Sequence, residues 1–287
     1  MCDLYETARK HKIARESLKL ALQSDSGLSK VWVVVEGEGD VVVFSRMFTD
    51  ATISVNQGIN DKGNGGYSAV EDIVNYVCSE IPESKVFGIR DKDYTSYLSP
   101  VQTFSDNVFV TDRRDLEMTL VESPSVRTAL LSIPRFEKAE SKVWQMLRYV
   151  GYQRIYVDCH HLRCDFEEVV KVSLVWDFTT HSMTTEWKMN CDQALQNEFG
   201  ITSLQLGAFV DEKGLEHESD YDIIRGHDYV GYVSRALVNT AKYSEDYLYR
   251  TIYDHYSKQD FLTTRLSDSI RAWQEERGVE VVTVTMN

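Results

Sequence analysis

Several features are scarce or missing in this chain of 287 residues. Its five cysteines are odd in number and form no Cys-x-x-Cys pair, so the sequence predicts reduced thiols rather than a disulfide framework or a zinc site. No apolar run approaches the roughly 20 residues that a membrane-spanning helix needs. Residues 1–5 contain an acid and no apolar segment, which does not fit a secretory signal. We therefore expect a cytoplasmic protein that has no membrane partner.

Positive charge is also scarce. The chain has 31 Lys and Arg against 45 Asp and Glu, a formal net charge of −14. Because a typical non-specific nucleic-acid binder is basic, a long polyanion would be repelled unless bound metal ions, local basic clusters or a basic partner subunit offset this charge. Basic residues gather within residues 9–15 and at Arg113-Arg114. Both clusters also fit a solvated surface, which is the commoner role of a charge run.

Common catalytic and nucleotide-binding motifs are missing as well. Residues 57–66 form a glycine-rich stretch with Lys62, but it matches neither a P-loop nor a dinucleotide fingerprint. A phosphate-binding loop that uses Lys62 and backbone amides is one interpretation, and we favour a plain connection. No Gly-x-Ser-x-Gly nucleophile elbow is present. His160-His161 and the nearby cysteines lack the paired spacing of a zinc site, which favours a structural role.

Acidic residues directly follow two apolar runs. Residues 31–35 end at Glu36-Gly37, and residues 86–90 end at Asp91-Lys92-Asp93. Because ligands of open α/β sheets collect at the carboxyl ends of strands, these acids are expected to converge. Converging carboxylates repel one another unless a cation lies between them, and oxygen-only ligands suit Mg²⁺ or Mn²⁺. The alternatives are an ordinary loop acid for Glu36 and turn-favoured aspartates after the second strand.

A third acidic motif follows the short apolar run 108–110, at Asp115-Leu116-Glu117. The order Glu-Gly, Asp-x-Asp and then Asp-Leu-Glu resembles the Toprim superfamily, in particular the OLD-type nucleases, over roughly residues 30–120. The resemblance implies a metal-dependent phosphodiesterase that binds Mg²⁺ or Mn²⁺. It assigns the metal to Glu36, Asp91, Asp93 and Glu117, with Glu36 as an alternative general base or acid. Glu117 also fits a first-turn charge at a helix N-terminus.

The resemblance implies roles for basic residues and partners too. Lys92 or Arg113 would stabilise transition-state charge, and Lys62, Arg113 and Arg114 are candidate substrate contacts. Within the superfamily the chain resembles the Toprim nuclease subunits of PARIS anti-phage defence systems, which work beside an ABC-type ATPase. That likeness implies a toxin restrained by the ATPase, with RNA such as tRNA favoured over DNA as substrate. The alternatives are a DNA nuclease of the OLD-like type and a non-catalytic Toprim interaction module.

The alternation of apolar runs predicts an α/β fold. Strands and helices alternate up to about residue 120, which indicates a mostly parallel sheet with helices on both faces. We expect an N-terminal helix within residues 1–28, spanning about 4–22, and a Toprim core at 29–122. A mainly helical part at 123–287 would serve specificity, homodimerisation or partner docking. In that part we expect helices near 136–150, 220–242 and 262–273, and short strands or loops at 158–176 and 201–210.

Overall fold

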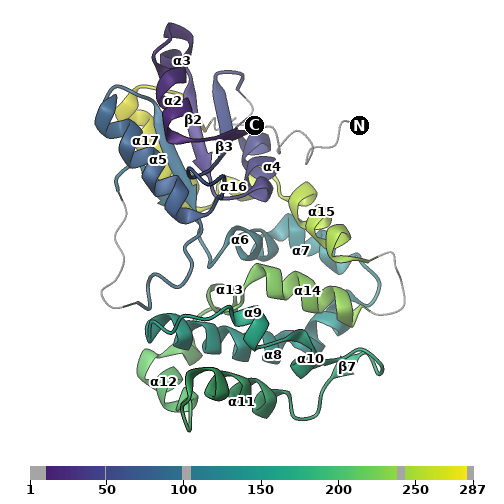
Figure 1. Ribbon diagram of the computed structural model, residues 1–287. Helices are drawn as coiled ribbons and strands as arrows, with labels where there is room; N and C mark the ends of the chain where they lie inside the picture. Colours follow the sequence, from purple (N-terminus) through teal and green to yellow (C-terminus); the bar gives the residue numbers. More distant parts are fainter. Residues whose placement is uncertain (1–10, 49, 99–104, 238–242, 283–287) are drawn as a thin grey trace. The chain divides into compact units, whose positions relative to one another are not determined.

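The computed structural model describes residues 11–48, 50–98, 105–237 and 243–282 (Figure 1). The chain divides by its internal contacts into two units. The first comprises residues 1–92, 103–126 and 253–287, and the second comprises residues 93–102 and 127–252. Each unit is a compact body with its own core.

The first unit is built on a five-stranded, all-parallel sheet with the strand order β1-β3-β2-β4-β5. The strands are β1 (Lys12–Ile13), β2 (Val31–Val35), β3 (Ile53–Gly58), β4 (Val86–Arg90) and β5 (Val108–Val110). The helices of this unit are α2 (Arg15–Leu22), α3 (Asp25–Ser29), α4 (Glu38–Met47), α5 (Tyr67–Glu80), α6 (Leu116–Glu122), α16 (Lys258–Phe261) and α17 (Arg265–Arg277). The α/β class and the mostly parallel sheet predicted from the sequence are confirmed.

Two different cores cover the faces of this sheet. On one face α2 and α5 bury an aliphatic cluster that includes Leu18, Val34 and Ile73 (Figure 1). The other core is aromatic, with Phe87 of β4 at ring-centroid distances of 6.2 Å from Phe48 and 4.8 Å from Trp273. Burial on both faces explains why β2 and β4 read as continuous apolar runs rather than as alternating ones.

The strand order creates a switch point at the centre of the sheet. From β2 the chain crosses to β3 on one side, and it then returns to β4 on the other side of β2. At such a reversal the two outgoing connections diverge, which leaves a crevice beyond the carboxyl ends of the two central strands. The residues that follow β2 and β4 therefore occupy the position where an open α/β sheet binds its ligands.

The C-terminal residues return to the first unit. Trp273 of α17 packs on Phe87, and its indole N–H donates to the side-chain oxygen of Asn107 at 2.9 Å. This grouping differs from the predicted helical part at 123–287, because Phe261 and Trp273, near the C-terminal end of the chain, pack in the aromatic core of the sheet. The helix expected near 262–273 is present as α17.

The second unit is mainly helical and packs around its longest helix (Figure 1). Its elements are α8 (Phe136–Cys159), α9 (Phe166–Val169), α10 (Val172–Val175), β6 (Trp176–Asp177), β7 (Ser182–Met183), α11 (Trp187–Phe199), α12 (Leu206–Lys213), η1 (Leu215–His217), α13 (Asp220–Ile223) and α14 (Gly226–Ala236). Two helices, α7 (Pro124–Leu131) and α15 (Glu245–His255), cross the division between the units. None of the helices in the described ranges is both long enough and apolar enough to cross a membrane.

Three predicted segments need correction. The helix expected over 4–22 begins only at Arg15, because residues 12–13 pair with β3 as a short strand, and residues 4–10 lie outside the described residues. Much of 158–176 and 201–210, expected as strands or loops, forms the short helices α9, α10 and α12, and only β6 is a strand. The helix expected over 220–242 is divided into α13 and α14, and residues 238–242 lie outside the described residues.

Candidate functional site

Glu36 follows β2 at the switch point of the sheet. Its carboxylate Oε1 accepts a hydrogen bond from the backbone N–H of Asp91, with an N–O distance of 2.8 Å. Its carbonyl oxygen accepts from the backbone N–H of Gly66 and from the side-chain amide of Gln57, both at 3.2 Å. The structure therefore brings together the two strand-end acids that the sequence places after β2 and β4.

The glycine-rich loop packs against this strand end. A side chain at Gly65 would place its Cβ 2.7 Å from the carbonyl oxygen of Glu36, so only glycine lets the loop pass here without a shift. The Asn60 side-chain oxygen accepts from the backbone N–H groups of Lys62 and Asn64 at 3.0 Å each. Lys62, a predicted substrate contact, is an exposed residue of this hydrogen-bonded turn.

Asp40 joins Glu36 from the first turn of α4. Its Oδ2 accepts the backbone N–H of Gly37 at 2.6 Å, which caps the start of the helix. The residue keeps some exposed surface, yet its carboxyl group is surrounded by protein. Burial, reinforced by the negative charges of Glu117 and Glu36, raises the pKa of Asp40 well above its usual range.

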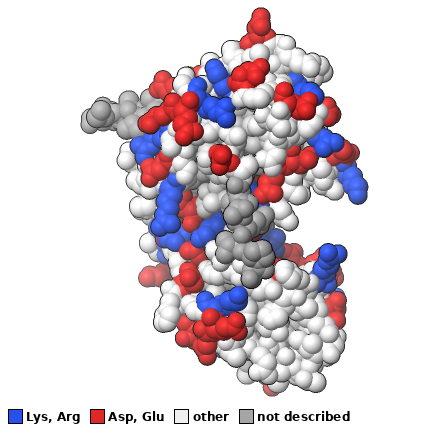
Figure 2. Space-filling view, turned by 90° about the vertical axis from the view of Figure 1, so that its left-hand side faces the viewer, with Lys and Arg blue, Asp and Glu red and all other residues white. Residues whose placement is uncertain are grey.

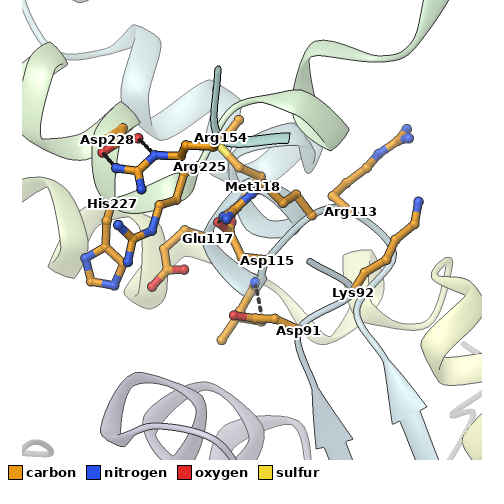
Figure 3. Close-up of polar contacts among 12 residues, drawn as sticks. Asp91, Lys92, Arg113, Asp115, Glu117, Met118, Arg154, Arg225, His227 and Asp228 are labelled. Carbon is orange, nitrogen blue, oxygen red and sulfur yellow. Dashed lines mark hydrogen bonds and ion pairs between the residues drawn. The ribbon is translucent and has the colours of Figure 1, made fainter. Parts of the chain in front are cut away.

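Asp91 links β4 to the start of α6. Its Oδ1 accepts the backbone N–H of Leu116 at 2.9 Å (Figure 3). Burial raises the pKa of Asp91 well above its usual range, and the charges of Asp40, Asp115, Glu36 and Glu117 add to the effect. We call these five residues the acid cluster. Its carboxyl groups share one electrostatic environment, so they cannot all ionise cheaply without a positive counter-charge.

The remaining two acids of the cluster lie at the start of α6. Asp115 is the N-cap, and its Oδ1 accepts the backbone N–H of Met118 at 2.9 Å while its Oδ2 pairs with Arg114 at 2.7 Å. Glu117 is buried, and its Oε1 accepts the hydroxyl of Tyr253 at 2.7 Å. Figure 3 shows the carboxyl groups of Asp91 and Glu117 on one side of the start of α6.

Two of the basic residues nearby, Arg113 and Arg114, pair with acids. Arg113 pairs with Glu122 through two nitrogens at 2.5 Å each, and Arg114 pairs with Asp115. The backbone N–H of Lys92 donates to the Thr111 hydroxyl at 3.0 Å. In Figure 3 the side chains of Lys92 and Arg113 extend away from the carboxyl groups of Asp91 and Glu117. Lys92 and Arg113 therefore lie at the periphery of the cluster.

The basic residues within 9–15 make surface ion pairs. Lys12 lies 3.2 Å from a carboxylate oxygen of Glu38, and Arg15 lies 3.4 Å from one of Asp72. Arg9 and Lys10 fall outside the described residues. Exposed pairs of this kind contribute little to stability, typically about 0.2–1 kcal/mol.

Asp93, a predicted metal ligand, begins the second unit. Its backbone φ of 49° lies in the left-handed region, which aspartate tolerates better than most residues. The acid cluster is thus composed of residues of the first unit, and Asp93 is not counted among them.

The side chains of the acid cluster are of the type that binds a divalent cation, but their positions do not form a metal site. All five groups are carboxyl groups, the donors that Mg²⁺ and Mn²⁺ prefer. Burial is the main cause of the raised pKa values of Asp40 and Asp91, and the neighbouring negative charges, which a cation would offset, raise them further. Within the described ranges, however, no group of three Asp, Glu, His or Cys side chains is close enough to hold a metal ion as it stands. To share one ion, the carboxyl groups of the cluster would have to lie closer together than they do.

Cys159, His160 and His227 make contacts within the second unit. The ring of His160 stacks on Tyr156 at a centroid distance of 4.1 Å, and the Cys159 thiol donates to the carbonyl of Tyr97 at 3.3 Å. His227, in the first turn of α14, lies 2.7 Å from the Tyr249 hydroxyl. These contacts favour the structural interpretation of the His160-His161 segment.

Three residues at the site were not among the predicted candidates. Asp40 lies four residues after Glu36 and looks like an ordinary helix-start acid in the sequence. Asp115 was named as part of the third acidic motif but not as a site residue, and in the structure it is the N-cap of α6. Tyr253 comes from a helix 136 residues away from Glu117, so no local pattern could indicate it.

Comparisons with known proteins gave no match, either to a protein-family model or to a curated protein. The likeness to the Toprim superfamily consequently rests on the motifs of the sequence alone.

Proposed function

We propose that this chain is a Toprim-type, metal-dependent phosphodiesterase. The observation that carries the proposal is the acid cluster at the switch point between β2 and β4, where Glu36 and Asp91 are joined by a hydrogen bond. Ligands of open α/β sheets bind in this crevice. A group of carboxylates that crowd one another there is suited to Mg²⁺ or Mn²⁺ bound to a phosphate.

The acids of the cluster have distinct roles in this proposal. Asp91 and Glu36 are the principal ligands, with Glu117 and Asp40 beside them, and Glu36 is the alternative proton-transfer group near the leaving oxygen. The bound metal would stabilise negative charge on the scissile phosphate and lower the pKa of a water molecule. The backbone N–H groups of Asp91 and Leu116 donate to the carboxylates of Glu36 and Asp91 and fix their orientation in the cluster. Lys92 and Arg113, at the periphery of the acid cluster, would contact the sugar-phosphate backbone of the substrate.

RNA is the proposed substrate, and tRNA in particular. Net charge of −14 disfavours extended duplexes, whereas a compact RNA is recognised by shape and needs fewer phosphate contacts. On the face drawn in Figure 2, acidic and basic side chains are interspersed, which fits short local contacts better than a continuous basic track. DNA cleavage of the OLD-like type is the alternative substrate choice.

The biological role in the proposal comes from the resemblance to PARIS nuclease subunits. The chain would act in the bacterial cytoplasm as an anti-phage toxin, restrained by an ABC-type ATPase until infection. The second unit would supply partner docking, specificity or a homodimer contact.

A second candidate is a non-catalytic Toprim module that binds a partner. Its support is that Glu36, Asp91 and Asp115 each accept a backbone N–H, which would be a sufficient structural role for these acids. If the chain is an enzyme, loss of the Glu36 carboxylate should abolish its toxicity to cells, whereas a non-catalytic module predicts no such loss.

The experiment that tests the proposal is expression of the chain alone in bacteria, followed by sequencing of newly formed RNA and DNA ends. We expect toxicity and discrete RNA ends with the wild type, and neither with Glu36→Ala. A matched control is Glu38→Ala, which removes a neighbouring acid that pairs with Lys12 at the surface. Equal toxicity of wild type and Glu36→Ala, or the absence of new ends of either kind, would favour the non-catalytic module.

A further inference from the structure

Tyr253 brings a neutral hydrogen-bond donor into the acid cluster. The residue is buried, with 5% of its surface exposed, and its hydroxyl donates to Oε1 of Glu117 at 2.7 Å. We propose that Tyr253 is a positioning residue, which orients the Glu117 carboxylate for a divalent cation. The inference rests on the proposed function.

Helix α4 leaves space for the side chain of Tyr253 and binds its backbone. A Cβ at Gly39 would lie 2.6 Å from the Tyr253 hydroxyl, so the glycine leaves the space that the phenol occupies. Arg46, on the same helix, donates to the backbone carbonyls of Tyr253 at 2.6 Å and Asp254 at 2.8 Å. Gly39 and Arg46 are seven residues apart, two helical turns, and therefore share one face of α4.

The contact with Tyr253 explains the second glycine of the sequence Glu36-Gly-Glu-Gly-Asp40. The first glycine, Gly37, is the N-cap of α4, whereas Gly39 admits Tyr253. Helix α4 thus contributes Asp40 to the acid cluster. The same helix, through Gly39 and Arg46, holds Tyr253, the residue that donates to Glu117. The C-terminal return of the chain to the first unit completes the site as well as the core.

The chemistry of the donor matters. A hydroxyl fixes the rotation of the carboxylate it binds but adds no positive charge, so it leaves the negative potential that attracts a cation intact. A lysine or arginine in the same place would compete with the metal for the carboxylate. Residues that orient metal ligands through such hydrogen bonds typically change metal affinity by about 10–100-fold when they are mutated.

The test measures Mn²⁺ affinity by titration calorimetry on the full chain, without reference to cleavage. We expect Tyr253→Phe to lower the affinity by about 10–100-fold. Tyr256→Phe is the matched control: it removes another buried hydroxyl of the same unit, whose charged neighbours are Asp112 and Asp260 rather than the cluster. This control should bind Mn²⁺ as the wild type does.

A double-mutant cycle shows whether Tyr253 acts through Glu117. If it does, the losses from Tyr253→Phe and Glu117→Gln do not add, because either change removes the same oriented carboxylate. Gly39→Ala provides a second route, since its methyl group would displace the hydroxyl, and it should weaken binding much less in the Tyr253→Phe background. Additive losses, or a Tyr253→Phe affinity within about twofold of the wild type, would overturn the positioning role and leave the proposed function standing. A wild type that binds no Mn²⁺ would overturn both.

Discussion

Asp40 is a residue at which stability and the proposed function oppose each other. Its raised pKa means that the folded state holds the proton more tightly than the unfolded state does. The resulting stability is fully present below the unfolded pKa of about 3.9 and is lost as the pH rises through the folded value. At neutral pH without metal, an ionised Asp40 therefore destabilises the fold through burial and the charges of Glu117 and Glu36.

The first prediction concerns Asp40→Asn. The amide keeps an acceptor for the Gly37 N–H but removes the charge. The metal-free variant should therefore be more stable than the wild type at pH 7.5. The difference should shrink as the pH falls toward 4. Urea unfolding at both pH values measures it. A variant less stable than the wild type at pH 7.5 would show that Asp40 is ionised and favourably paired.

A second prediction at the residue scale concerns Cys191. The residue is fully buried on α11, and burial, with the charge of Asp192, raises the pKa of its thiol to about 12. Because the thiolate is the reactive form, iodoacetamide at pH 8 should label Cys164, which is partly exposed, and spare Cys191 in the native protein. Peptide mass spectrometry reads both sites. In urea both should react, and equal native labelling would contradict the burial of Cys191.

Among the elements, α17 has an N-terminus supported from the sheet. The two carboxylate oxygens of Asp112 accept the backbone N–H groups of Arg265 at 2.8 Å and Leu266 at 3.0 Å, and Thr264 caps Ser267 at 3.0 Å. We predict that Asp112→Ala lowers the free energy of unfolding by about 1 kcal/mol, a typical cost of losing a helix cap. Asp106→Ala, at an exposed position before β5, is the control and should be neutral. Equal unfolding curves for the two variants would contradict this cap.

The sequence predicts the elements whose own residues determine them. The run that became β2 is apolar throughout, the run that became β4 is apolar up to Arg90, and the stripe that became α8 keeps its helical period, so each was predicted correctly in type. The two-residue strand β1 could not be predicted, because only its pairing with β3 holds residues 12–13 extended. The short helices α9, α10 and α12 have too few residues to show a period.

In the candidate site, too, the sequence predicts the residues that a local pattern indicates and misses those that depend on tertiary contacts. Glu36 and Asp91 were predicted because each directly follows a buried strand, and parallel strands bring such positions to one edge of the sheet. Asp40 required knowledge that α4 starts at Glu38 and turns its third position toward the cluster. Tyr253 depends on the return of the C-terminal residues to the first unit, a tertiary contact over 136 residues that no spacing in the sequence reveals.

For the whole molecule, we predict that Mn²⁺ stabilises the fold. A cation that binds only the folded state raises stability by mass action, by about 2.7 kcal/mol at 100 times its dissociation constant. The melting temperature of the wild type should rise in millimolar Mn²⁺ or Mg²⁺ at pH 7.5, and Asp91→Ala should abolish the rise while remaining folded. The effect should weaken at low pH, where protons occupy Asp40 and Asp91. An unchanged melting curve with both metals would count against the site.

Cleavage of nucleic acid by the purified protein would show directly whether this chain is a metal-dependent phosphodiesterase. Total tRNA and plasmid DNA are incubated with the wild type and with Glu36→Gln, in Mg²⁺, in Mn²⁺ and in excess chelator, and the products are resolved on denaturing gels. We predict that the wild type cuts tRNA with either metal, that the chelator stops the reaction, and that Glu36→Gln is inactive although folded. Cleavage that persists in chelator, or a Glu36→Gln variant as active as the wild type, would contradict it.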